Sequence, residues 1–179
     1  MKAIDILLVV VAQKLKKRID EIPLSRAIKD LVGKSTLQNE ILGDLQQEFA
    51  SAPEKGEEFS LEELGSALGS GFNGSLGNHS TVLVSRLVGG KMPGGFNAPP
   101  IKGYLAKTWG LGPSSSDGVL LLATTLEPPK RLASEVEAKA WPRWCCLCLR
   151  SAIRNLSDFP RCCRRWWRRR RRCSGSDQQ

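Results

Sequence analysis

Residues 32–49 read VGKSTLQNEILGDLQQEF, a short loop followed by a segment with the periodicity of an amphipathic helix. Apolar side chains recur there at every fourth position, which places them on one helical face; they are Leu37, Ile41, Leu45 and Phe49. Ser35 and Gln38 have the spacing of a capping box, in which each side chain bonds a free backbone amide near the other. The stretch therefore predicts a helix over residues 35–49 with Ser35 as its N-cap.

The string Gly33-Lys34-Ser35 also resembles the end of a nucleotide-binding phosphate loop. That motif requires a glycine five positions before Gly33, because the loop wraps the phosphates with backbone amides. Ile28 occupies this position, and no strand pattern precedes it. Nucleotide binding through this loop is therefore not expected.

Carboxylates follow the predicted helix beside its apolar stripe. Glu40, Asp44 and Glu48 recur at four-residue spacing, and residues 40–63 hold eight carboxylates against one lysine. One interpretation is a solvated acidic face. The other is a docking face for basic clefts of partner proteins, where charge steers encounter without tight binding.

The segment before this helix also has helical periodicity, over about residues 4–19, and Ile22-Pro23 is expected to end it. Its unbroken apolar run, residues 6–12, is too short to span a membrane and lacks the flanks of a signal peptide. We therefore predict that the run is one buried helix face. Downstream, Ser60 and Glu63 form a second capping-box pattern that opens a helix with its apolar side chains at Leu61, Leu64 and Leu68.

The remaining segments also favour helices. Residues 81–88 are apolar without a decisive period, and residues 89–100 hold so many glycines and prolines that little regular structure is expected there. Pro99 or Pro100 suits the first turn of a following helix. Ser134 and Glu137 predict a cap for a last helix that ends near Trp141. The pattern as a whole predicts an all-α fold.

The net positive charge and the cysteines of the chain are confined to the C-terminal tail, residues 142–179. The net charge of the whole chain is +9, yet residues 1–141 hold 16 basic and 16 acidic side chains. The six cysteines all follow residue 141, so the preceding part must fold by apolar burial, as intracellular domains do. Most of these cysteines are adjacent to one another, which makes them poor tetrahedral ligands, and the single CxxC spacing, Cys145 to Cys148, has no second pair, so zinc is not expected. Three interpretations of the tail stay open. It is a disordered basic segment, an arm that binds nucleic acid or anionic membrane, or the product of a misread reading frame or retained intron.

Several strings along the chain closely resemble the acyl carrier domain of fungal-type fatty acid synthase alpha subunits. They occur in order at residues 10–17, 22–25, 28–45, 61–64, 91–96, 109–111, 117–120 and 134–141. The family pattern has two glycines before its Lys-Ser pair, whereas only Gly33 stands here. The loop before Ser35 is therefore expected to be one residue shorter than in the family.

The resemblance implies that Ser35 is the attachment point for 4′-phosphopantetheine, taken from coenzyme A. From the residues themselves, no metal site is expected. The resemblance also implies a four-helix carrier core followed by a four-helix structural annex. The core would comprise residues 1–50 and, after a linker, the last core helix within residues 51–75; the annex would comprise residues 76–141.

The chain is then expected to be a cytoplasmic carrier module rather than an enzyme, holding growing fatty acyl chains as thioesters. Its expected partners are a phosphopantetheinyl transferase and the ketosynthase, ketoreductase and other domains of a fatty acid synthase; no nucleic acid or membrane partner is expected. Two alternatives stay open from the sequence. One is a basic protein that binds nucleic acid or membrane through residues 142–179, and the other is a non-functional fragment of a synthase subunit.

Overall fold

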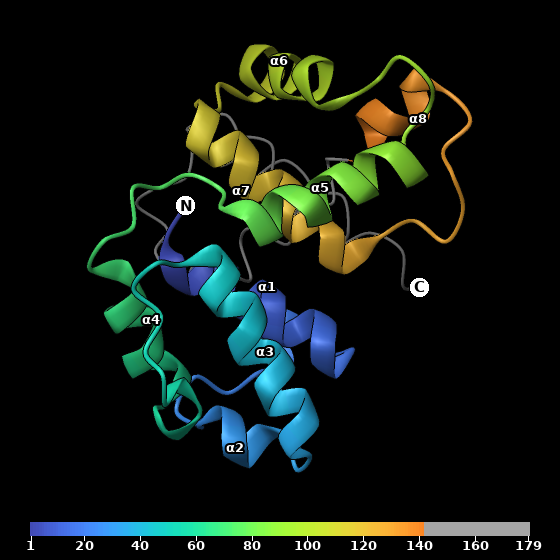
Figure 1. Ribbon diagram of the computed structural model, residues 1–179. Coiled ribbons are helices and arrows are strands. Elements are labelled where there is room, and N and C mark those ends of the chain that lie inside the picture. Colours follow the sequence, from blue (N-terminus) through green and yellow to red (C-terminus); the bar gives the residue numbers. More distant parts are fainter. Residues whose placement is uncertain (142–179) are drawn as a thin grey trace, which may run out of the picture.

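The computed structural model describes residues 1–141, and every prediction for the tail falls outside these residues. Within them the chain forms eight α-helices and no strand, which confirms the all-α prediction (Figure 1). The helices are α1 (Ala3–Leu15), α2 (Ile28–Leu31), α3 (Ser35–Glu48), α4 (Leu61–Gly69), α5 (Asn78–Lys91), α6 (Ala98–Trp109), α7 (Pro113–Ala123) and α8 (Glu135–Ala140). Three 3₁₀ turns join them: η1 (Ile19–Glu21), η2 (Gly56–Glu58) and η3 (Thr124–Leu126).

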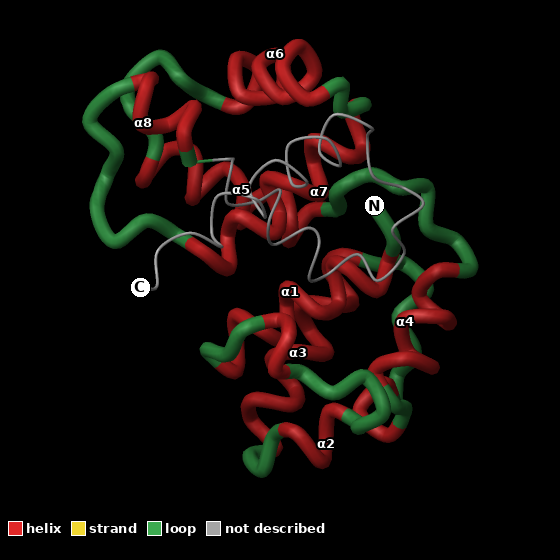
Figure 2. The backbone as a smooth tube through the Cα atoms, turned by 180° about the vertical axis from the view of Figure 1, so that it is seen from behind, coloured by secondary structure: helices red, strands yellow, loops and turns green. Residues whose placement is uncertain are grey.

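The helices form two groups of four, which Figures 1 and 2 show from opposite sides. Helices α1 to α4 make one group, and α5 to α8 make the other, with α1 lying between them. The buried apolar residues nevertheless form one continuous cluster that includes members of both groups. The predicted division at residue 75 therefore stays a prediction, since the packing is continuous across it.

Helix α1 is the centre of this cluster. Its apolar run, residues 6–12, is buried on every side, because α3 and α4 pack against one flank while α7 and η3 pack against the other. The prediction of a single buried face was thus wrong: a helix shared by two layers has no solvent side. The helix also ends earlier than Ile22-Pro23. Lys16 adopts the left-handed conformation (φ 53°), and its amide donates to Ala12 and Gln13.

The apolar stripe of α3 packs as its spacing predicts. Ile41, Leu45 and Phe49 are buried, and Leu37 is half-buried at the start of the helix. The ring of Phe49 meets that of Phe72 edge to face, with 5.7 Å between centroids. This contact joins the end of α3 to the loop after α4.

The capping box before α4 is confirmed. Ser60 Oγ accepts from the Glu63 amide, and the Glu63 carboxylate accepts from the Ser60 amide. Two further α4 amides, those of Leu61 and Glu62, donate to carbonyls of the segment before α2. The N-terminal amides of α4 are therefore satisfied by its own cap and by a neighbouring loop. The predicted apolar positions of α4 are buried: Leu61, Leu64 and Leu68.

The apolar segment whose period was not decisive, residues 81–88, lies in the second group of helices. Residues 81–88 are helical within α5, and this helix continues through Gly89 and Gly90 to Lys91, so the expected irregular stretch is shorter than predicted. Both glycines are exposed, while Leu87, Val88 and Met92 are buried, so packing holds the last turn despite low helix propensity. Pro99 and Pro100 lie in the first turn of α6, and Ser134 caps α8, both as predicted.

Candidate functional site

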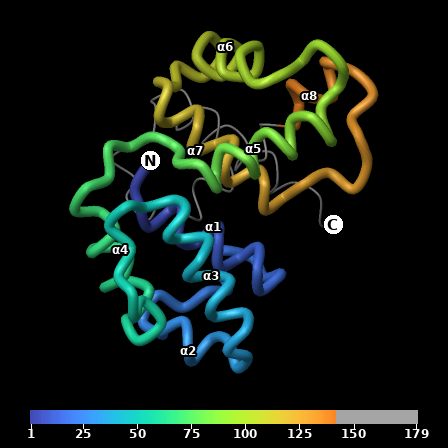
Figure 3. The backbone as a smooth tube through the Cα atoms, viewed as in Figure 1, coloured from blue at the N-terminus to red at the C-terminus, as the bar shows by residue number. Residues whose placement is uncertain are grey.

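Ser35 is the first helical residue of α3. The helix begins beside α2, at the end of its group that is remote from α5 to α8, and ends close to the second group (Figure 3). Gly33, Lys34, Ser35 and Thr36 are all exposed. A Cβ atom placed on Gly33 would meet nothing within 4 Å. The serine therefore stands at an open corner of the molecule.

The predicted cap geometry at this site was wrong. The N-cap residue is Lys34, in an extended conformation, and no side chain caps α3. Because Ser35 already has helical geometry, its hydroxyl lies outside the capping position and makes no hydrogen bond within residues 1–141. The Gln38 side-chain amide instead donates to the Val32 carbonyl at 2.6 Å. Gln38 therefore fastens the loop before the serine, a role that the three-residue spacing alone did not show.

The backbone around Ser35 is electropositive. The first amides of an α-helix lack intrahelical acceptors, and the aligned peptide dipoles add partial positive charge at this end. Helix α3 has 14 residues, and no acidic side chain lies in its first turn. An anion attached to the Ser35 oxygen would therefore lie at the favourable end of the helix.

The three carboxylates on α3 have different surroundings. Glu40 is 53% exposed and lies 3.3 Å from the Lys14 ammonium. Asp44 is only 16% exposed; it lies 3.0 Å from the same ammonium and 3.6 Å from Nδ1 of His79. Burial alone would lower the pKa of Lys14, but the hydrogen bonds and charges of Asp44 and Glu40 outweigh it and raise that pKa.

Glu48, the third carboxylate, bonds the second group of helices. Its two oxygens accept from the amides of Gly77 and Ser80, each at 2.8 Å. These amides belong to the N-cap and third residue of α5, so Glu48 caps that helix from α3. The assumption that all three carboxylates are solvated therefore holds only for Glu40. Whether this face docks partner proteins stays a prediction.

Residues 1–141 offer no group of three or more side chains suited to hold a metal ion. None of the helices described is both long enough and apolar enough to cross a membrane. The predicted absence of zinc in the cysteine-rich tail falls outside the described residues.

Comparison with known proteins adds evidence on the family to which this chain is related. Residues 1–146 match the family described as the acyl carrier domain of fatty acid synthase subunit alpha. Fatty acid synthase subunit alpha of Penicillium patulum is 60% identical over 140 residues, and that of Schizosaccharomyces pombe is 59% identical over 141 residues. The corresponding subunit of Saccharomyces cerevisiae is 54% identical over 142 residues.

The matches cover 78–79% of this chain and 8% of each of these three relatives. The range of residues that matches the family covers both helix groups, including the start of α3 and the segments packed against it. The chain therefore belongs to the family of acyl carrier domains of fatty acid synthase alpha subunits.

Proposed function

We propose that this chain carries acyl groups for fatty acid biosynthesis on a 4′-phosphopantetheine arm attached to Ser35. The observation that carries the proposal is the free hydroxyl of Ser35, exposed at the start of a 14-residue helix. In the family pattern this position is the modified serine. Residues 33–36 are all exposed, and the loop before the serine is held by the bond from the half-buried Gln38. A modifying enzyme can therefore approach the serine without unfolding the core.

The attachment chemistry needs little from the chain itself. The Ser35 oxygen would attack the β-phosphorus of coenzyme A in the active site of a phosphopantetheinyl transferase. A new phosphorus–oxygen bond forms to serine, the bond to the bridging diphosphate oxygen breaks, and adenosine 3′,5′-bisphosphate leaves with its electron pair. The α3 amides then face the resulting phosphodiester anion. When bound, the arm supplies a terminal thiol that holds the acyl chain as a thioester.

The partners would be this transferase and the ketosynthase, ketoreductase and other centres of a fatty acid synthase in the cytoplasm. We propose that docking uses the acidic face of α3, which the sequence assigned to Glu40, Asp44 and Glu48. Glu40 is the member whose exposure fits this role best, since Asp44 and Glu48 already bond partners within the chain. A charge reversal at Glu40 alone therefore tests docking more cleanly than reversal of all three.

Replacing Ser35 by Ala is expected to abolish modification completely. Intact mass after incubation with coenzyme A and a broad-specificity transferase should show one added phosphopantetheine group on the parent protein and none on Ser35→Ala. Thr36→Ala removes the neighbouring exposed hydroxyl and should be modified fully. Since Ser35 makes no capping bond, its replacement should change the free energy of unfolding by less than about 0.5 kcal/mol. Persistent modification of Ser35→Ala, or none of the parent, contradicts the proposal.

Replacing Gln38 by Ala is expected to slow modification without abolishing it. The lost bond to the Val32 carbonyl would release the loop that presents Ser35, while the removed side chain is only half-buried. A neutral hydrogen bond contributes about 1 kcal/mol, so the melting temperature should fall only slightly. The measurement is the initial rate of modification, with the exposed Gln46→Ala on the same helix as the control. Equal rates for all three proteins would show that the loop needs no such tie.

A further inference from the structure

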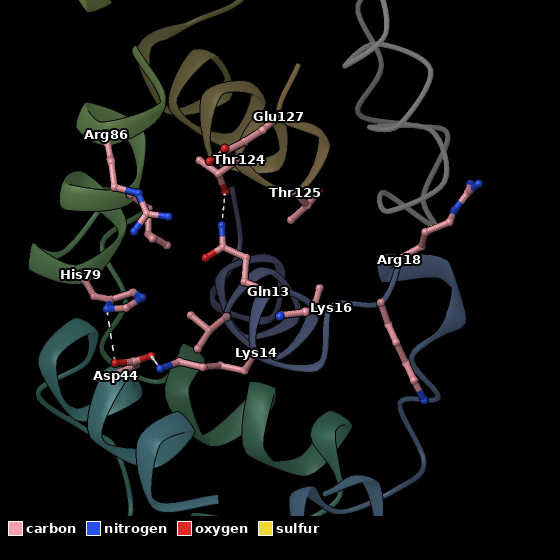
Figure 4. Close-up of a pocket in the computed structure, with 14 residues that line it drawn as sticks. Gln13, Lys14, Lys16, Arg18, Asp44, His79, Arg86, Thr124, Thr125 and Glu127 are labelled. Atoms are coloured by element: carbon pink, nitrogen blue, oxygen red, sulfur yellow. Dashed lines mark hydrogen bonds and ion pairs between the residues drawn. The ribbon is translucent and has the colours of Figure 1, made fainter. Parts of the chain in front are cut away.

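A cleft lies between the two helix groups, away from the start of α3. It has a volume of about 620 Å³, which is in the range of small-molecule sites. The end of α1, the middle of α3, helix α5 and the turn η3 contribute to its wall (Figure 4). The attachment chemistry at Ser35 does not use this cleft, although Asp44 of the acidic face lines it.

The side chains around the cleft are predominantly cationic. Five lysines and arginines line it against two carboxylates, an excess of three positive charges without counting His79. This is unlike residues 1–141 as a whole, where 16 basic and 16 acidic side chains balance. The cationic side chains are Lys14, Lys16, Lys17, Arg18 and Arg86.

Both carboxylates of the cleft already have cationic partners. Asp44 contacts Lys14 and His79, and Glu127 lies 4.0 Å from the ammonium of Lys91. In contrast, no carboxylate in residues 1–141 lies within ion-pair distance of Lys16, Lys17 or Arg86. The close-up shows the Arg86 side chain extending from α5 toward the space that Gln13 and His79 also border (Figure 4). Arg18 is paired with Asp20 at 3.0 Å and extends away from the cleft (Figure 4). The uncompensated charges at the cleft are therefore those of Lys16, Lys17 and Arg86.

Lys16 adds an independent observation. It has the one positive φ among non-glycine residues of the part described, a conformation that glycine adopts at far lower energy. Helix ends that need this conformation commonly have glycine. Strained backbone concentrates at functional sites. The left-handed conformation of Lys16 at the rim of the cationic cleft therefore supports a functional role for its positive charge.

We propose that the cleft binds a small molecule through a diphosphate group. Arginine offers a planar pair of donors to phosphate oxygens, and lysines add point charges. The volume admits one compact ligand rather than a folded partner surface. Nucleoside diphosphates and coenzyme A derivatives both carry this chemistry. The site is separate from Ser35 and does not depend on its modification.

The test measures binding of inorganic pyrophosphate, adenosine diphosphate and coenzyme A to the full chain by calorimetry. Pyrophosphate should bind the parent protein, and Arg86→Gln should weaken this binding roughly tenfold, the loss expected for one charge-assisted contact. Lys107→Gln, an exposed cation on α6 outside the cleft, should bind as the parent does. The arginine-rich tail is the same in all variants, so a difference between them isolates the cleft.

Lys16→Gly separates binding from folding. Glycine suits the left-handed position, so the melting temperature without ligand should stay equal or rise while pyrophosphate binding weakens. Chemical shift changes in amides of residues 14–18 and of α5 should accompany binding. Tighter binding of adenosine diphosphate or coenzyme A than of pyrophosphate would support the proposal and name the source of the diphosphate. Absence of binding, or equal affinity in the parent, Arg86→Gln and Lys16→Gly, would overturn it.

Discussion

Reversing the charge of Glu48 is expected to destabilise the protein by about 3 kcal/mol or more, because two hydrogen bonds to a charged group are lost together. Its carboxylate accepts from the amides of Gly77 and Ser80 and provides the only side-chain cap that the described structure gives to α5. A lysine there would also place positive charge at the positive end of α5. Glu48→Gln should have an intermediate effect, since an amide offers one acceptor oxygen where the carboxylate offers two.

Glu40→Lys is the matched control for this prediction. It reverses the same charge on the same helix, but Glu40 is exposed and makes one contact with Lys14, so its effect should stay below about 1 kcal/mol. Urea unfolding followed by circular dichroism gives both free energies. Hydrogen exchange should show the amides of α5 opening first in Glu48→Lys. Equal stability of the two reversals would mean that the contact between Glu48 and α5 does not hold the two helix groups together.

The Glu48 cap also shows where sequence reasoning ends. The four-residue spacing correctly put this residue beside the apolar stripe of α3, but its partners are amides 29 and 32 residues away. Backbone amides have no signature in the side-chain pattern. A carboxylate that caps a distant helix therefore looks the same in sequence as one that faces water.

The cap at Ser35 was missed for a different reason. A serine three residues before glutamine matches a capping box, and the helix start was predicted at the correct residue. Whether the serine caps depends on whether its own backbone is extended or helical. Here Lys34 is extended and Ser35 is helical, a difference of one position that propensities do not resolve. The box at Ser60 and Glu63, by contrast, formed as its spacing predicts.

Burial was predicted well where one face of a helix is apolar and less well where a helix is apolar all round. The stripes of α3 and α4 gave the correct buried residues except Leu37, which is half-buried. The run in α1 showed that the segment is buried but could not show that two layers share it, because no polar side remains to mark an orientation. Because α1 is packed from two sides, added volume between α1 and α4 is expected to destabilise the protein.

Replacing Gly65 by Val is expected to destabilise the protein by about 3 kcal/mol through overpacking between α1 and α4. Gly65 is buried on α4, and a Cβ atom there would lie 2.9 Å from Cγ1 and 3.0 Å from Cβ of Ile4. The Cβ atom of Ile4 is fixed by its backbone, and helix geometry holds χ1 of a β-branched residue near one rotamer, so neither atom moves aside readily. The helices would have to separate, which exposes the central helix of the core.

Gly69→Val is the control for this last change, since Gly69 ends the same helix, is exposed, and would have nothing within 4 Å of an added Cβ atom. Valine exceeds glycine in helix propensity, so this variant should keep or slightly gain stability. Combining Gly65→Val with Ile4→Ala should recover part of the loss, because the two side chains then no longer compete for one space. Chemical unfolding of the parent, Gly65→Val, Ile4→Ala and the double variant gives the coupling energy between the two positions. Strictly additive effects would show that Gly65 matters for a reason other than its approach to Ile4.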